Sequence, residues 1–130
     1  HEDAKLAPLI DDPERGLYLQ TLVYFSSTIQ NAFQLTYYPD RFVDNTSYGL
    51  NAQNRGISRL KETWNIIDKQ IGDNEWILGN KFSAVDIYLF MLTTWLSDSE
   101  GHPPKHEFPN VNRVATAVSQ RPCVRHVYYD

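Results

Sequence analysis

The segment at residues 82–96 restricts the possible folds more than any other part of the chain. Read as a helix from residue 84 to about residue 96, it carries apolar side chains on nearly every side. A helix without a hydrophilic side has to be surrounded by the rest of its domain. We therefore expect a buried central helix here, with these apolar residues: Ile87, Tyr88, Leu89, Phe90, Met91, Leu92, Trp95 and Leu96.

Ser83 and Asp86 mark the start of that helix. Ser83 can accept a hydrogen bond from the amide of Asp86, and the Asp86 carboxylate can reach back to the amide of Ser83. This is a capping box with Asp in place of the usual Glu. We interpret Asp86 as a structural cap rather than as a catalytic acid. Replacing either residue with Ala is expected to cost on the order of 1 kcal/mol or somewhat more.

The other periodic patterns are helical as well. A stripe in residues 13–39 consists of Tyr18, Leu22, Phe25, Ile29 and Phe33. A second pattern spans residues 50–71 and ends at Gly72, as helices often do. A third begins at Pro109 and stops before Arg121-Pro122, and a short turn follows. The 130 residues have room for one domain. We predict an all-α bundle of about five helices, with residues 1–12 as a linker and residues 13–130 as the helical domain.

The first of these helices is unusual because no residue between positions 17 and 39 is charged. Its second side carries neutral polar and aromatic residues: Gln20, Tyr24, Ser27, Asn31 and Gln34, with Thr28 and Gln30 alongside. An exposed helix face normally carries Lys, Glu or Arg. A neutral, hydrogen-bonding face suits a cleft, a dimer interface or a docking site for another domain. The alternative is that other helices of the same bundle cover it.

Composition and charge argue against several classes of function. The 12 basic and 16 acidic residues give a net charge of −4, and no basic run is present, so nucleic-acid binding is not expected. Gln, Ser, Thr and Asn recur too often in the first helix for a membrane span. The single cysteine, Cys123, excludes a disulfide framework and suggests a reducing compartment. Its place after Pro122 suggests a half-buried structural residue.

No catalytic or metal-binding constellation stands out in this chain. His102 and His106 flank Pro103-Pro104, which prevents a helix between them, and acidic or cysteine partners at ligand spacing are lacking apart from Glu107. We interpret both histidines as solvated loop residues. Serine-histidine-aspartate arrangements and phosphate-binding glycine loops are not present in the sequence either. We therefore predict no catalytic residue and no metal.

Three motifs carry a resemblance to a known family. The run WILGNKFSAVDIYLF at residues 76–90 resembles the buried-helix signature of cytosolic glutathione S-transferases, in which a Leu-Gly turn, a Phe-Ser cap and an Asp box open the central helix of the C-terminal domain. The segment from Phe108 to Pro122 is similar to the next helix of that domain. YYPDRF at residues 37–42 is similar to the end of its first helix in bacterial members, and the resemblance covers about residues 13–128.

The resemblance implies a helical C-terminal domain that a thioredoxin-like domain normally precedes. That absent domain supplies most of the glutathione site and activates the thiol. The reaction implied is conjugation of glutathione, as co-substrate, to a small hydrophobic electrophile by a cytoplasmic homodimer. The first residue is His rather than Met, so we expect a processed chain or a fragment, inactive by itself.

Carried over by position, the residues that would bind the substrate are Tyr24, Thr28, Gln30, Asn31 and Trp95. Trp95 matches a Trp that walls the electrophile pocket in the bacterial beta-like class. The sequence differs from that class at two places. Val23 replaces a common Asn, and Gln30-Asn31 replaces a common His-Lys pair. Core packing remains the alternative role for Trp95, and a polar contact between helices remains the alternative for the polar residues.

A different class of function is a non-catalytic interaction module. Helical domains of this kind also occur as docking units in translation factors and synthetase complexes. A charged or strongly apolar exposed patch would favour docking, and the neutral polar face of the first helix argues mildly against it.

Overall fold

The computed structural model describes residues 4–129, and within this range the protein is helical. The α-helices are α1 (Arg15–Tyr24), α2 (Gln30–Tyr37), α3 (Gly49–Ile71), α4 (Ala84–Thr93), α5 (Pro109–Ser119) and α6 (Pro122–Tyr128). Short 3₁₀ turns lie at Pro39–Phe42, Thr46–Tyr48, Asp98–Glu100 and Lys105–Glu107. In the described part, strand-like pairing is limited to isolated bridges in the turn before α4. The predicted all-α class is confirmed.

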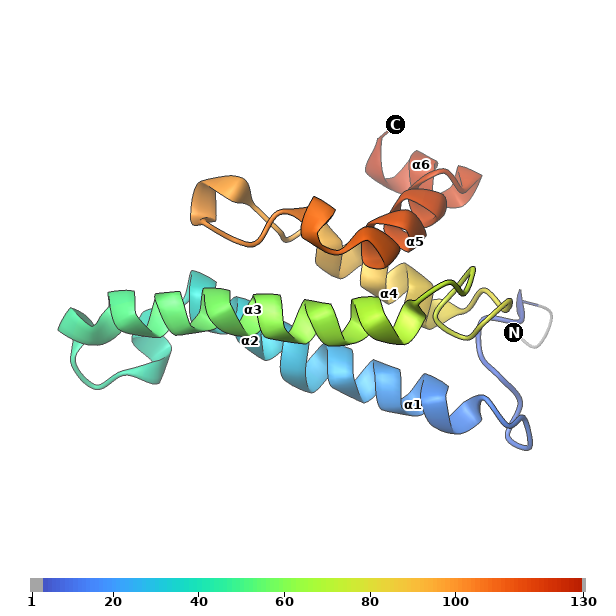
Figure 1. Cartoon of the computed structure of the whole chain (residues 1–130), viewed down its shortest axis with the longest axis horizontal. Helices are drawn as coiled ribbons and strands as arrows, with labels where there is room; N and C mark the ends of the chain where they lie inside the picture. The colour runs from blue at the N-terminus through green and yellow to red at the C-terminus, as the bar shows by residue number, and fades with distance from the viewer. Residues whose placement is uncertain (1–3, 130) are drawn as a thin grey trace.

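The helices form a bundle in which α3 is the long central rod of the view in Figure 1. The α1–α2 rod runs along one side of α3, while α5 and α6 lie on the other side and α4 lies behind. Helix α4 contacts both α1 and α5, and α3 contacts both α2 and α5. The largest fully buried side chains come from these helices and from the segments next to them, and include Phe25, Phe33, Trp64, Leu89 and Phe108.

The first predicted helix is one continuous rod that contains a π-helical segment, η2 (Phe25–Ile29), between α1 and α2. The hydroxyls of Ser26 and Ser27 donate to the Val23 carbonyl at 3.1 and 2.7 Å. Side-chain bonds of this kind compete with the backbone ladder and bend helices. The sequence pattern did not predict this π-helical segment. Its apolar residues, Phe25 and Ile29, continue the buried row of the helices on either side, so the pattern looks like that of an ordinary α-helix. Short π segments are frequent at functional sites.

Helix α3 packs tightly on α2 because Gly56 has no side chain. A Cβ at Gly56 would lie 2.8 Å from the Cγ2 of Thr36 and 3.0 Å from its backbone nitrogen. At the other end, Gly72 has a φ of 51° and terminates α3. This is the position predicted for the end of the helix, and a positive φ favours glycine there.

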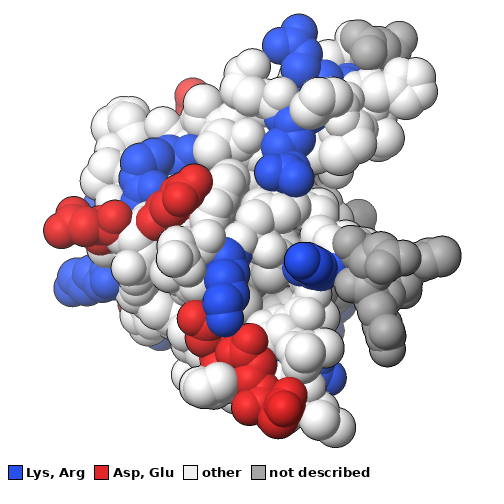
Figure 2. All heavy atoms as spheres, turned by 90° about the vertical axis from the view of Figure 1, so that its right-hand side faces the viewer, with Lys and Arg blue, Asp and Glu red and all other residues white. Residues whose placement is uncertain are grey.

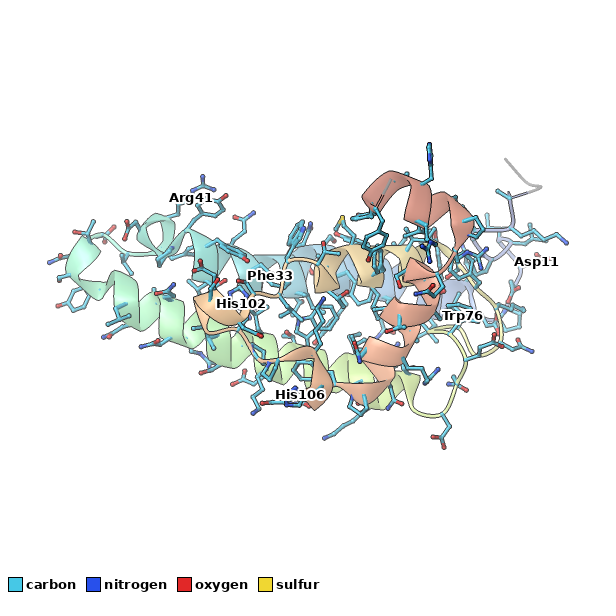
Figure 3. All side chains as sticks on the ribbon, turned by 90° about the horizontal axis from the view of Figure 1, so that it is seen from above. Asp11, Phe33, Arg41, Trp76, His102 and His106 are labelled. Atoms are coloured by element: carbon cyan, nitrogen blue, oxygen red, sulfur yellow. The ribbon has the colours of Figure 1, made fainter. Side chains whose placement is uncertain are left out.

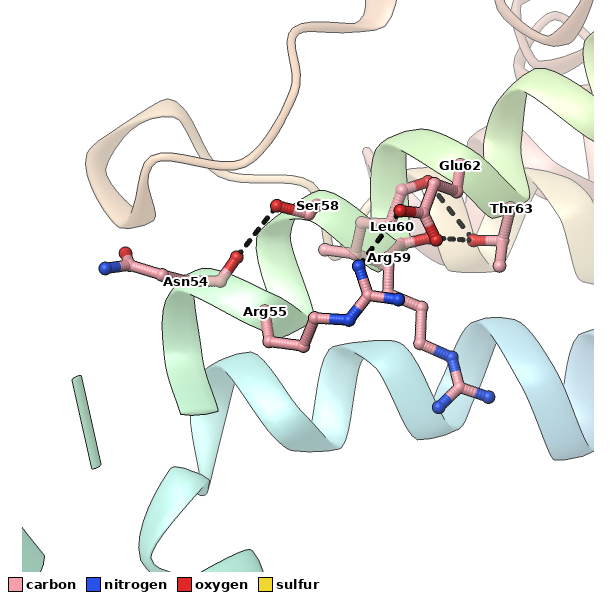
Figure 4. A network of polar contacts seen from close by, with 7 residues as sticks. All are labelled: Asn54, Arg55, Ser58, Arg59, Leu60, Glu62 and Thr63. Atoms are coloured by element: carbon pink, nitrogen blue, oxygen red, sulfur yellow. Dashed lines mark hydrogen bonds and ion pairs between the residues drawn. The ribbon is translucent and has the colours of Figure 1, made fainter. Parts of the chain in front are cut away.

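The opposite side of α3 is polar, as the sequence predicts. Arg55 forms an ion pair with Glu62 at 3.0 Å. Thr63, by contrast, is buried, and its hydroxyl donates to the carbonyl oxygens of Arg59 and Leu60 at 2.8 and 3.1 Å (Figure 4). Because the Arg55–Glu62 pair is exposed, it contributes little to stability. The hydrophobic side of the helix therefore provides most of its packing energy.

Helix α4 begins at the predicted place with the predicted capping box. The Asp86 carboxylate is fully buried and accepts hydrogen bonds from the amides of Ser83 at 2.8 Å and Ile77 at 3.0 Å. The helix ends at Thr93 rather than at about residue 96. The prediction of a buried central helix is confirmed, although one stripe of α4 remains partly exposed: Ala84, Ile87, Tyr88 and Met91.

The described part of the predicted linker is attached to the start of α4. The carbonyl of Leu6 accepts a hydrogen bond from the Ala84 amide at 2.8 Å. Lys81 forms ion pairs with Asp12 at 3.2 Å and Glu14 at 2.8 Å. Figure 2 views this end of the molecule and shows acidic and basic side chains next to one another. The linker role of residues 1–12 stays a prediction, and residues 1–3 lie outside the described range.

Candidate functional site

A groove lies between α2 and the C-terminal end of α4. Its larger hollow has a volume of about 450 Å³ and is lined by Phe33, Gln34, Tyr37, Tyr38, Thr94 and Trp95. A neighbouring hollow of about 300 Å³ is lined by Ser26, Ser27, Gln30, Asn31, Gln34 and Trp95. Because Gln34 and Trp95 line both hollows, the two are parts of one surface feature. We call it the α2–α4 groove; one end is aromatic and the other is polar.

Trp95 stands at the junction of the two ends. Its ring meets the ring of Phe33 edge-on, with centroids 5.5 Å apart, and 36% of the residue is exposed. Its backbone carbonyl accepts a hydrogen bond from the Tyr37 hydroxyl at 2.7 Å. Trp95 is therefore attached to α2 on one side and open to the groove on the other. The structure combines packing on Phe33 with a position in the groove, and a substrate contact by Trp95 stays a prediction.

Gln30 and Asn31 line the polar end of the groove, where the π segment passes into α2. The Gln30 side-chain oxygen accepts a hydrogen bond from the Tyr88 hydroxyl of α4 at 2.9 Å. Gln30 therefore makes the interhelical contact that was its alternative role, while also lining the groove. Asn31 lies beside it and is partly exposed. Substrate binding by either residue remains a prediction.

Tyr24 and Thr28 lie elsewhere. The Tyr24 hydroxyl donates to the carbonyl of Thr63 on α3 at 3.2 Å. Burial raises the pKa of Tyr24, and the nearby charge of Arg59 opposes this only in part. Thr28 is partly exposed and, like Tyr24, is not among the residues that line the two hollows. The cleft role predicted for these two residues stays a prediction, and the groove described here does not depend on them.

The lining of the groove is electrically neutral. Its residues include no Lys, Arg, Asp, Glu, His or Cys. Burial raises the pKa of Tyr37, as do the nearby Glu100 and Tyr38, so the Tyr37 hydroxyl keeps its proton. Such a surface provides apolar area, hydroxyls and amides, which suits an uncharged organic ligand. It contains no group that would act as a strong base or a thiol nucleophile.

One histidine differs from its predicted environment. His102 was expected to be a solvated loop residue, but it is 4% exposed. Its Nδ1 accepts a hydrogen bond from the Ser97 amide at 3.2 Å, and its Nε2 lies 3.1 Å from the Thr36 hydroxyl. Figure 3 shows His102 beside Phe33 and His106 away from it. The sequence contains no signal for this burial, because Thr36 is 66 residues away along the chain.

Two further expectations can be compared with the structure. His106 is exposed, as predicted. Cys123 is exposed, so the prediction of a half-buried cysteine is wrong. It occupies the first turn of α6, which packs on the bundle through the next residue, Val124, and through Tyr128. Within residues 4–129, His, Cys, Asp and Glu side chains form no group suited to a metal ion. In the same range, every helix is too short or too polar to cross a membrane.

Comparisons with known proteins agree with this architecture. The family described as glutathione S-transferase, C-terminal domain, matches residues 28–122. The uncharacterized GST-like protein YncG of Escherichia coli (strain K12) is 26% identical over 127 residues, which are 94% of this chain and 58% of that protein. A bacterial beta class glutathione S-transferase from Sphingomonas chungbukensis is 27% identical with a TM-score of 0.78, and the match covers 96% of this chain and 58% of that one.

A glutathione transferase homolog from Sulfitobacter has the same fold, with a TM-score of 0.85 at 21% identity over 97% of this chain and 66% of that one. This chain therefore spans 58% to 66% of the length of these relatives. The family match covers most of the helical bundle, including the capping box and the groove residues from Gln30 onward. The chain belongs to the glutathione S-transferase C-terminal domain family.

Proposed function

We propose that this chain is the electrophile-binding and dimer-forming half of a cytoplasmic glutathione transferase-like enzyme. The reaction is conjugation of a thiol, with glutathione as co-substrate, to a small hydrophobic electrophile. The observation that carries the proposal is the neutral α2–α4 groove with Trp95 between its aromatic and polar ends. An apolar surface with a few hydrogen-bonding groups is typical of sites for small organic molecules.

The thiol site belongs to a thioredoxin-like domain in this proposal. The groove offers no Cys or His, and the Tyr37 hydroxyl already donates to the Trp95 carbonyl. The Sulfitobacter homolog was solved with bound glutathione, and it is longer than this chain. These observations support a division in which the second domain activates the thiol. The isolated chain is then inactive.

Two apolar surfaces support the proposed contacts with a thioredoxin-like domain and with a second copy of the chain. The partly exposed stripe on α4, which includes Ile87 and Met91, would face the thioredoxin-like domain. Leu19 and Val23 on α1 and Ile66 on α3 are 46%, 61% and 54% exposed, and these surfaces suit a dimer interface. If Val23 lies in that interface, V23E should lower the sedimenting mass from dimer to monomer, and an unchanged mass would contradict the assignment.

The groove is tested by binding of N-phenyl-1-naphthylamine, an uncharged aromatic probe that fluoresces in apolar surroundings. Trp95→Leu should weaken binding about tenfold or more, because a central aromatic side chain often dominates a contact. Gln20→Ala is the matched control, since Gln20 is exposed on α1 and does not line the groove. Equal binding by W95L and the native chain would refute the assignment.

An assay of glutathione conjugation tests whether thiol activation belongs to the other domain. The chain alone should produce no conjugate from reduced glutathione and 1-chloro-2,4-dinitrobenzene above the uncatalysed rate. It should also fail to bind a glutathione resin. Conjugation by the purified chain would show that the thiol site lies within these 130 residues.

A further inference from the structure

His102 lies directly behind the aromatic end of the α2–α4 groove, although it does not line it. Its ring meets the ring of Tyr37 edge-on with centroids 5.1 Å apart, and that of Phe33 with centroids 5.7 Å apart. Both of these rings line the groove. His102 therefore supports two walls of the groove from the side that a ligand cannot reach.

The hydrogen bonds of His102 require a neutral ring. The Ser97 amide can only donate, so Nδ1 must accept and carries no proton. The proton of the neutral ring is then on Nε2, which donates to the Thr36 hydroxyl at 3.1 Å. The Thr36 hydroxyl donates in turn to the Phe33 carbonyl at 2.8 Å. The Ser97 amide, the His102 ring and the Thr36 hydroxyl therefore form a chain of hydrogen bonds. Every polar atom in this chain of hydrogen bonds has a partner only when His102 is uncharged.

This chain of hydrogen bonds joins two segments that form the groove. Thr36 and Tyr37 belong to the last turn of α2, whereas Ser97 follows Trp95 in the segment after α4. The Tyr37 hydroxyl also bonds to the Trp95 carbonyl at 2.7 Å. His102 and Tyr37 thus connect the same two segments through adjacent contacts. A change at His102 should alter the spacing of the rings that face the ligand.

We propose that His102 is a positioning residue that holds the aromatic wall of the groove in its ligand-binding shape, and that it does so only with a neutral ring. The residues it positions are Phe33, Tyr37 and Trp95. The inference rests on the proposed function, because it takes the groove as the place where the electrophile binds. His102 touches no ligand in this arrangement and acts through the rings in front of it.

The charged and titratable groups around His102 determine when the ring is neutral. Burial lowers the pKa of His102, and the nearby Glu100 and a hydrogen bond with the Trp95 backbone oppose this only in part. Lys61 and Glu107 lie beside the hollow on the other side of His102 and neutralise each other in an ion pair of 2.7 Å. Tyr37 keeps its proton, because burial raises its pKa. The ring is therefore neutral near pH 7 and becomes charged only in acid.

The test compares variants of the full chain in binding N-phenyl-1-naphthylamine. His102→Leu should weaken binding about tenfold at pH 7.5, because it removes both hydrogen bonds that join Ser97 to Thr36 and leaves the partly buried Ser97 amide without its acceptor. His102→Gln carries a donor and an acceptor and should bind within about threefold of the native chain. His106→Gln is the control, since His106 is an exposed histidine of the same loop. H102L within about twofold of the native chain would overturn the inference.

The pH profile separates positioning from a purely structural role. Once the pH is below the midpoint of His102, the native affinity should fall about tenfold per unit, because only the neutral fraction binds. H102Q should show no such fall, and H106Q should behave like the native chain. A fall that persists in H102Q would overturn the inference. This comparison also decides the matter if H102L does not fold.

A third readout needs no ligand and keeps this inference separate from the proposed function. The NMR signals of the Trp95 indole and the Tyr37 ring should shift with the same midpoint as the His102 ring, and these shifts should vanish in H102Q. If the probe fails to bind the native chain at any pH, the proposed function fails. The positioning role would then be supported if the Trp95 and Tyr37 signals shift with the midpoint of His102, and overturned if they do not.

Discussion

The buried carboxylate of Asp86 provides the sharpest energetic prediction. It accepts hydrogen bonds from the Ser83 amide at 2.8 Å, the Ile77 amide at 3.0 Å and the Ser83 hydroxyl at 3.3 Å. Asp86, Ser83 and Ile77 are 0%, 2% and 2% exposed, so water does not replace a lost acceptor. Asp86→Ala should therefore destabilise the fold by more than the loss of an ordinary exposed cap.

The magnitude follows from the two amides. Each buried donor left without a partner costs about 1–3 kcal/mol, whereas the Ser83 hydroxyl can turn toward another acceptor. We expect Asp86→Ala to lower the free energy of unfolding by about 3–5 kcal/mol. Ser83→Ala removes the hydroxyl that accepts from the Asp86 amide and donates to the Asp86 carboxylate, but it leaves both buried amides bound to Asp86 and should cost about 1 kcal/mol. A typical domain has a total stability of about 5–15 kcal/mol, so the first variant approaches the limit of folding.

The assay is urea unfolding at pH 7 followed by circular dichroism. Asp86→Asn should fall between the native chain and D86A, because the amide retains one acceptor oxygen for one of the two backbone donors. Asp73→Ala is the control, since Asp73 is exposed in the turn after α3, and it should stay within about 0.5 kcal/mol. If D86A costs no more than S83A, the bond to Ile77 adds nothing and the reasoning is refuted.

Three further predictions concern the packing of α3, the start of α5 and the pH dependence of stability. Gly56→Ala should destabilise by more than about 1 kcal/mol, because its Cβ would lie 2.8 Å from Thr36, whereas Gly16→Ala has free space and should be neutral or stabilising in the same urea assay. Asp68→Ala should cost about 2–4 kcal/mol, since its carboxylate accepts from the amides of Asn110 at 2.8 Å and Val111 at 2.9 Å; an unfolding midpoint equal to that of D73A would contradict this. Burial lowers the pKa of His102 below the ordinary 6.5, so the unfolded chain takes up the proton first and stability is lost as the pH falls below about that value. The stability advantage of the native chain over H102Q should therefore shrink between pH 7.5 and 5, and a constant difference would show that burial does not perturb this histidine.

The helix pattern and the cap were predictable because both are local. The apolar stripes repeat at helical intervals, and the Ser83–Asp86 box involves residues three apart. The second acceptor role of Asp86 was not predictable, because Ile77 reaches it through the turn before α4. The π segment was missed for a related reason: its residues are ordinary helix residues, and no local signal separates the two kinds of turn.

The candidate site also combines features that the sequence predicted with contacts that it did not. Trp95, Gln30 and Asn31 were expected at the cleft, and the structure brings all three to one groove. Tyr24 has the same helical spacing on the sequence, but its hydroxyl contacts Thr63 on α3. Which neighbour a half-buried side chain reaches depends on the packing of helices, and the helical spacing alone does not contain that information.

The amino-acid sequence alone determined that this chain forms an all-α bundle, that its buried helix begins at residue 84, and that the first helix presents an uncharged face. These features follow from periodicity, capping and the lack of charge, which act over a few residues. Only the tertiary structure decided that His102 is buried behind the groove and that Cys123 is exposed. Burial depends on which distant segments meet, as when the loop after α4 places His102 against Thr36 of α2.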